Sequence, residues 1–191
     1  MYTALGHHIK RFITINEEEL QGVLPWFRYL QFKKKQNLLV EGKVCKDNYF
    51  TVKGCLRLFF INEKGIEQTI QFALENWWLA DYTSFEKQQP SGFYMQAVEK
   101  CEVLAISYTD QEKMLHQHPQ MERYFRLMHQ RANAAAQFRL KSLYSLSREE
   151  LYHQFNKFYP EFVQRIPQYL LASFLGFTPE YLSEIRRKAI S

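Results

Sequence analysis

The stretch IPQYLLASFLGFTPEYLSEIRRK, residues 166–188, contains two segments of helical apolar spacing separated by a glycine. Pro167 suits the first position of a helix, where its missing N–H costs no hydrogen bond. Gly176 follows the first segment, where helices often end in a left-handed residue that glycine adopts without steric penalty. Thr178 and Pro179 suit the cap and first position of a second helix. The stretch therefore predicts two helices joined by a tight turn.

The apolar residues of this stretch predict one face that packs inward. Leu171 and Leu175 share a face of the first helix, where Ala172 is small enough for a close crossing. Leu182 and Ile185 share a face of the second helix. This pattern predicts a helix-turn-helix, whose second helix presents its outer face to the DNA major groove. The alternative is an ordinary helical hairpin with solvated charges.

The expected outer face carries groups that suit DNA. A carboxylate can accept a hydrogen bond from cytosine N4, a guanidinium can pair with guanine, and cations at the end of the helix suit phosphates. The candidate DNA-binding residues are Gln168, Thr178, Glu180, Tyr181, Ser183, Arg186, Arg187 and Lys188.

Composition limits the class of protein. The 191 residues are 46% hydrophobic, and the formal charge of +5 favours a polyanionic partner only weakly. Cys45, Cys55 and Cys101 lie far apart without a CxxC, so we expect free thiols in a reducing compartment. No signal-peptide core and no membrane-spanning apolar window occur, so we expect a cytoplasmic protein without a membrane partner.

The first half of the chain alternates between helical and extended patterns. Residues 16–30 read as a helix capped by Asn16 and broken at Pro25. Residues 32–106 contain short apolar runs separated by turn residues, including a hairpin over 56–72 with its tip at 62–65. Repeated short strands of this kind predict a β-sandwich or a rolled β-barrel.

A long helix is expected after Pro119, with apolar residues at alternating spacings of four and three. This seam indicates either packing against the chain's own β-domain or a helix–helix dimer contact. A second apolar face, formed by Tyr124, Leu127, Ala134 and Phe138, would let one face serve each role. The candidate dimer-interface residues are Met121, Phe125, Met128, Ala132 and Ala135.

A capping box, Ser147 to Glu150, begins a further helix after the long one. We therefore place a domain boundary around residues 142–147. The expected organisation is a β-rich domain over 1–118, a dimerisation helix over 119–145 and a compact helical domain over 146–191.

The whole chain resembles transcriptional regulators of the cyclic-AMP receptor/fumarate-nitrate regulator (Crp/Fnr) family, in the short form common in Bacteroidetes. The resemblance is carried by FKKKQNLLVEGKVCKDNYFTVKGCLRLFF (32–60), the long helix, and PQYLLASFLGFTPEYLSEIRRK (167–188). It implies an α+β fold: a cyclic-nucleotide-binding-like β-roll (double-stranded jelly roll), a dimerisation helix and a helix-turn-helix domain. It also implies a homodimer that binds a near-palindromic double-stranded DNA operator and contacts RNA polymerase.

The region that matches the family's cyclic-phosphate site is WWLADYTSFEKQQPSGFYMQAVE (77–99). It lacks the arginine that neutralises the phosphate in family members that bind cyclic nucleotides, and no arginine occurs between Arg57 and Arg123. Because desolvating an unpaired phosphate is costly, we expect cyclic AMP not to bind and predict no cofactor. The candidate pocket for an unknown effector comprises Trp78, Asp81, Tyr82 and Lys87.

Other functions have less support in the sequence. The family includes haem sensors, but His7, His8, His116, His118 and His129 are expected to be surface residues. A cupin-like enzyme would need clustered ligands on its strands, and residues 32–106 contain no histidine, so we expect no enzymatic activity. A β-roll module that binds a small molecule or a protein, and has lost DNA binding, remains the alternative.

Overall fold

The structure is a computed structural model that describes residues 2–188, and it divides into two compact units. The first unit contains the chain up to residue 60 together with residues 71–130. The second contains residues 61–70 together with the chain from residue 131 onward. This division differs from the boundary expected at 142–147, because it falls within the long helix and assigns the hairpin tip to the carboxyl-terminal unit.

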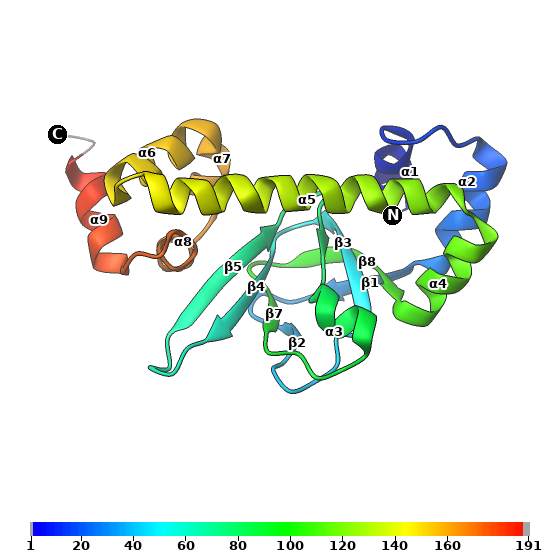
Figure 1. Ribbon diagram of the computed structural model, residues 1–191, viewed down its shortest axis with the longest axis horizontal. Coiled ribbons are helices and arrows are strands. Elements are labelled where there is room, and N and C mark those ends of the chain that lie inside the picture. The colour runs from blue at the N-terminus through cyan, green and yellow to red at the C-terminus, as the bar shows by residue number, and fades with distance from the viewer. Residues whose placement is uncertain (1, 189–191) are drawn as a thin grey trace. The chain divides into compact units, whose positions relative to one another are not determined.

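Two four-stranded sheets form the β-roll (Figure 1). One has the strand order β1 (Arg28–Phe32), β8 (Cys101–Ser107), β3 (Asp47–Lys53) and β6 (Trp78–Leu79). The other has the order β2 (Asn37–Leu39), β7 (Tyr94–Ala97), β4 (Leu56–Ile61) and β5 (Glu67–Ala73). The β1–β8, β3–β8 and β4–β7 pairs are antiparallel, and Leu104 pairs with both Tyr29 and Phe50.

Helices cover the first sheet. They are α1 (Thr3–Lys10), α2 (Glu17–Val23), the 3-10 turn η1 (Leu24–Trp26), α4 (Tyr108–Gln117) and the start of α5 (Gln120–Ser145). The short helix α3 (Tyr82–Lys87) follows β6 in the chain. Figure 1 shows α1, α2 and α4 beside the green amino-terminal part of α5. The predicted break at Pro25 is confirmed, since α2 ends at Val23, and Asn16 forms a capping box with Glu19.

An aromatic core holds α5 against the sheet. The ring of Trp78 lies 5.3 Å from that of Phe50 and 5.2 Å from that of Phe125, measured between centroids. Met121 and Phe125 are 0% and 5% exposed within this cluster. Burial of such side chains is worth about 1.5–3 kcal/mol each.

The core corrects two of the candidate dimer residues. Met121 and Phe125 pack inside their own unit, so they cannot also face a second chain. Met128 is half-buried, and Ala132 and Ala135 are exposed. The alternative interpretation of the seam, packing against the chain's own β-domain, therefore holds for its amino-terminal part.

A buried hydroxyl joins three elements of this core. The hydroxyl of Tyr124 accepts a hydrogen bond from Trp78 Nε1 at 2.9 Å and lies 2.7 Å from His8 Nδ1, with which it also hydrogen-bonds. Burial raises the pKa of Tyr124 well above its ordinary value, so the phenol stays neutral and able to donate. The bonds connect α1, β6 and α5.

Four helices complete the second unit: α6 (Arg148–Phe158), α7 (Pro160–Arg165), α8 (Gln168–Leu175) and α9 (Pro179–Lys188). The predicted capping box is confirmed, because Ser147 accepts from the Glu150 N–H while the Glu150 side chain accepts from the Ser147 N–H. The core of this unit includes Leu151, Val163, Leu170, Leu171, Leu175, Leu182 and Ile185.

Cys45, Cys55 and Cys101 lie outside any disulfide, as the sequence indicated, and the structure shows that all three are buried. Burial raises the pKa of Cys45 to about 11, so this thiol stays protonated and poorly nucleophilic at neutral pH. Within the described residues, no group of His, Cys, Asp or Glu has an arrangement that could hold a metal ion. No helix of residues 2–188 is both long and apolar enough to cross a membrane.

Replacing Tyr124 with Phe should destabilise the first unit. The variant removes one oxygen from the core and leaves the buried Trp78 N–H without this acceptor, so the free energy of unfolding should fall by about 1–3 kcal/mol. Urea denaturation followed by tryptophan fluorescence measures the change. The matched control is Tyr144→Phe, which removes the same atom from a side chain that is 85% exposed and should change nothing. Equal effects of the two variants would contradict the assigned role of the hydroxyl.

Candidate nucleic-acid interface

Helices α8 and α9 are joined by a turn at Gly176. The backbone of Gly176 is left-handed, with φ 76° and ψ 30°, and the N–H of Phe177 donates to the carbonyl of Ala172 at 2.8 Å. A Cβ at Gly176 would have no atom within 4 Å. The requirement for glycine is therefore conformational rather than spatial, as the sequence predicted.

The inner face of α9 is apolar and buried. Leu182 and Ile185 are 0% and 2% exposed, and Ala172 of α8 is fully buried. The Thr178 hydroxyl accepts a hydrogen bond from the Tyr181 N–H at 3.3 Å, which confirms the predicted cap. These contacts orient α9 by its apolar side and leave the other side in solvent.

The candidate residues on α9 lie mostly on that solvent side. Glu180, Ser183 and Arg187 are exposed, while Tyr181 and Arg186 are half-buried. Two further exposed candidates lie elsewhere, since Thr178 precedes α9 and Gln168 begins α8. The structure thus gathers most of the predicted set on one helix and leaves Gln168 on its neighbour.

Carboxylates offset part of the positive charge at the end of α9. The ammonium of Lys188 lies 3.2 Å from a carboxylate oxygen of Glu184 and 3.5 Å from one of Glu149, at the start of α6. The hydrogen bond to Glu184 is the main reason that the pKa of Lys188 is raised. Both ion pairs are exposed and contribute little stability. The sequence did not reveal the pair with Glu149, because it joins residues far apart in the chain.

Tyr181 is held by two neighbours that sequence reasoning missed. The guanidinium of Arg148 lies 5.5 Å from the centre of the Tyr181 ring, within the range of a cation–π contact. The ring of Phe177 meets it edge-on, with 5.7 Å between centroids. Tyr181 therefore helps to join α9 to α6 and to the turn.

The candidate effector residues differ in burial and in the contacts that they make. Trp78 belongs to the core, and Tyr82 places its ring 4.7 Å from that of His129. Lys87 is exposed at the end of α3. These contacts do not depend on a ligand.

Asp81 caps α3 with its own carboxylate. The carboxylate accepts hydrogen bonds from the backbone N–H groups of Thr83 at 3.2 Å and Ser84 at 3.3 Å. The Ser91 hydroxyl donates to it at 2.7 Å. The side chain is buried, so the free N–H groups at the start of α3 are satisfied by an anion that belongs to the chain.

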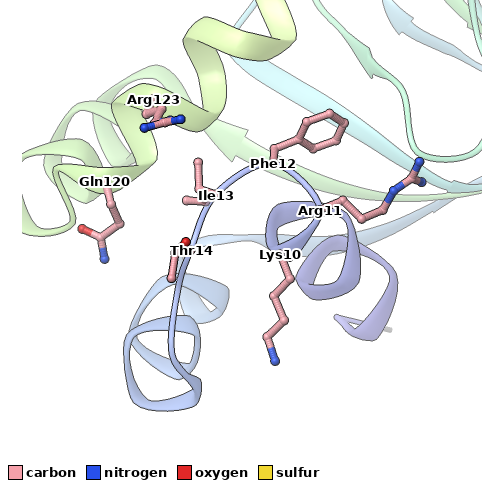
Figure 2. A pocket seen from close by; sticks show the side chains of 7 residues that line it. All are labelled: Lys10, Arg11, Phe12, Ile13, Thr14, Gln120 and Arg123. Atoms are coloured by element: carbon pink, nitrogen blue, oxygen red, sulfur yellow. The ribbon is translucent and has the colours of Figure 1, made fainter.

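A surface hollow of about 640 Å³ lies elsewhere on the first unit (Figure 2). Figure 2 shows that the cationic side chains of Lys10, Arg11 and Arg123 extend in different directions, and the ammonium of Lys10 pairs with Glu17. Its positive charges therefore do not converge on one ligand position. It is lined by Lys10, Arg11, Phe12, Ile13, Thr14, Gln120 and Arg123, none of which is a candidate effector residue.

The histidines occupy varied environments. His7, His116 and His129 are exposed and His118 is half-buried, whereas His8 is 7% exposed. The expectation of a surface position is therefore wrong for His8, because its ring packs against Phe50 and hydrogen-bonds to Tyr124. Partial burial lowers the pKa of His129.

Comparison with known proteins agrees with this architecture. Residues 29–118 match the model of the cyclic nucleotide-binding domain. The cAMP-activated global transcriptional regulator CRP of Salmonella typhimurium is 23% identical over 111 residues, which cover 56% of this chain and 53% of the relative. The chain thus spans about half the length of the curated relatives it matches.

Solved structures show the same fold over more of the chain. FixK2 from Bradyrhizobium japonicum has a TM-score of 0.70 at 17% identity, covering 85% of this chain and 83% of its own. The c-di-GMP responsive regulator CLP from Xanthomonas campestris has a TM-score of 0.72 at 11% identity, covering 91% of each chain. The amino-terminal β-roll is thus a cyclic nucleotide-binding-type domain. The chain is similar to transcriptional regulators of the Crp/Fnr family.

Proposed function

We propose that this protein is a sequence-specific DNA-binding regulator of transcription that acts as a homodimer. The observation that carries the proposal is α9, which is braced by α8 across Gly176 and keeps a polar and cationic face in solvent. Two helices in this relation form a helix-turn-helix, whose second helix enters the major groove. The CRP relative is a transcriptional regulator by name, and its match supports the same class of function here.

The polar residues of α9 form two groups, one suited to base edges and the other to phosphates. Glu180 and Ser183 can meet base edges, since a carboxylate accepts from cytosine N4 and a hydroxyl can donate or accept. Arg186, Arg187 and Lys188 carry positive charge at the carboxyl-terminal end and suit phosphates. Lys188 is paired with Glu149 and Glu184, so a DNA phosphate has to compete with these two carboxylates for its ammonium.

The proposed dimer uses a different stripe of α5 from the one predicted. Ala136, Leu140 and Leu143 recur at spacings of four and three, which is the spacing of a coiled-coil seam. Leu140 and Leu143 are 53% and 37% exposed, and the neighbouring Tyr144 is 85% exposed. Two chains paired along this stripe would carry two copies of α9, and successive major grooves require a separation of about 34 Å between them.

The proposed sensory domain does not bind cyclic AMP. Asp81 places a buried carboxylate at the start of α3, in the region that resembles the family's phosphate site, and it would repel a bound phosphate. Arg57 lies on β4, where its guanidinium donates to Gln96 at 2.7 Å and lies 3.9 Å from the Phe59 ring centre. Calorimetric titration with millimolar cyclic AMP should give no binding heat, and saturable heat would contradict this part of the proposal.

Replacing Arg186, Arg187 and Lys188 together with Ala should weaken binding to duplex DNA and flatten its salt dependence. The slope of log affinity against log salt should fall by about 1 for each phosphate that the variant no longer neutralises. Fluorescence anisotropy measures both quantities on fragments from around the protein's own gene. The matched control replaces Lys33, Lys34 and Lys35, which removes the same charge from the exposed turn between β1 and β2.

The control should retain most of the wild-type affinity and slope. If both triple variants are weakened equally, binding depends on net charge and α9 is not the reading element. If the wild-type protein shifts no fragment, the alternative holds, in which the β-roll serves a small molecule or a protein partner.

Replacing Leu140 and Leu143 together with Glu should convert the dimer to a monomer. Charges placed on a buried helix–helix seam cannot be solvated or paired there, so association should fail and DNA affinity should fall with it. Sedimentation equilibrium reports the mass. Val40→Glu alters an exposed apolar residue of similar accessibility, 41%, and should leave the mass unchanged. A wild-type protein of monomer mass would refute the homodimer.

A further inference from the structure

Strand β5 forms one edge of its sheet, where backbone groups lack a neighbouring strand. Residues 67–70 of this strand belong to the second unit, together with α8 and the later part of α5. In that unit, side chains occupy hydrogen-bonding positions along the strand edge.

Ser173 of α8 binds the edge with one hydroxyl. Its Oγ donates to the carbonyl of Glu67 at 2.8 Å and accepts from the N–H of Thr69 at 2.8 Å. These two backbone groups, two residues apart, are the ones that a residue of an added parallel strand would engage. Ser173 therefore substitutes for one residue of a neighbouring strand.

Arg139 of α5 extends the same attachment. One of its nitrogens donates to the carbonyl of Ile70 at 3.0 Å and the other to the carbonyl of Phe174 at 2.6 Å. The guanidinium also lies 4.1 Å from the centre of the Phe174 ring. A single planar cation thus holds β5 and α8 to the same point of α5.

We infer that Ser173 and Arg139, together called the β5 clamp, are positioning residues that couple the sensory strand β5 to the DNA-binding helices. The inference rests on the proposed function. Strand β5 continues from residue 70 into residues 71–73 of the first unit. Helix α8 packs directly on α9, and Ala172 and Leu182 are both fully buried. A change that shifts β5 therefore reaches α8 through hydrogen bonds of fixed direction, and it reaches α9 through the packing of α8 on α9.

The clamp accompanies DNA binding and does not oppose it. In the clamped arrangement Glu180, Ser183 and Arg187 remain exposed, so the reading face of α9 is uncovered. If DNA favours the clamped arrangement, linkage requires that DNA also make the clamp harder to open, by the same factor. The N–H of Thr69 reports this opening, because its exchange with solvent requires the bond to Ser173 to break.

The experiment measures hydrogen exchange at the Thr69 amide in the full-length protein, with and without a duplex fragment from around its own gene. In the wild type, DNA should slow this exchange at least about 5-fold, the lower end of common coupling factors. Ser173→Ala should exchange faster, show no response to DNA and bind DNA more weakly by the same coupling factor. Ser173→Thr, which keeps the hydroxyl, should restore the response.

Ser145→Ala is the matched control, because its hydroxyl donates only to the carbonyl of Lys141 within α5. It should behave as the wild type does. A wild type that binds DNA without any change in Thr69 exchange would overturn the β5 clamp and leave the proposed function intact. A wild type that binds no DNA fragment would overturn both. Reduced affinity in Ser173→Ala with an unchanged Thr69 response would identify Ser173 as a stabilising residue only, and would also overturn the inference.

Discussion

The burial of one face of α5 in the chain's own aromatic core is the constraint on which the rest of the structure depends. Met121, Tyr124 and Phe125 pack against Phe50 and Trp78, and the Tyr124 hydroxyl fixes this packing with bonds of defined direction. A helix cannot rotate about its own axis once side chains on successive turns are buried. The burial therefore decides which residues of α5 stay exposed, and with them the surface available to a second chain.

The carboxyl-terminal unit is built mainly from short helices. Its helices are too short to be stable alone, so they depend on caps and on a shared apolar interior. Ser147 and Thr178 provide caps, Gly176 provides the reversal, and Leu182 and Ile185 provide the interior. Because each of these devices acts on the inner side or the ends of a helix, the outer side of α9 remains free to carry polar groups.

The β-roll has the fold of a cyclic nucleotide-binding domain, and the backbone N–H groups at the start of its helix α3 have partners within the chain. Asp81 serves the helix terminus that would attract an anion, and Ser91 in turn donates to Asp81. These three donors stabilise the buried carboxylate, whereas a second anion beside it would be disfavoured. The fold of a cyclic nucleotide-binding domain thus occurs here with a buried carboxylate at the start of α3.

The sequence by itself determined the local structure. It predicted the break at Pro25, the hairpin tip at 62–65, the helix caps at Asn16, Ser147 and Thr178, and the left-handed turn at Gly176. These features depend on residues a few positions apart, so their physics is visible in a single segment. Most of the polar face of α9 was visible for the same reason, since helical periodicity places residues without knowledge of their partners.

Only the tertiary structure decided which apolar face of α5 is buried, because a seam at spacings of four and three looks the same whether it meets the chain's own core or a second copy. It also decided that His8 is internal, that Glu149 and Arg148 reach α9, and that Ser173 binds the edge of β5. Each of these contacts joins residues distant in the chain. Such contacts depend on where whole elements pack, and that packing is a property of the assembled core rather than of any one segment.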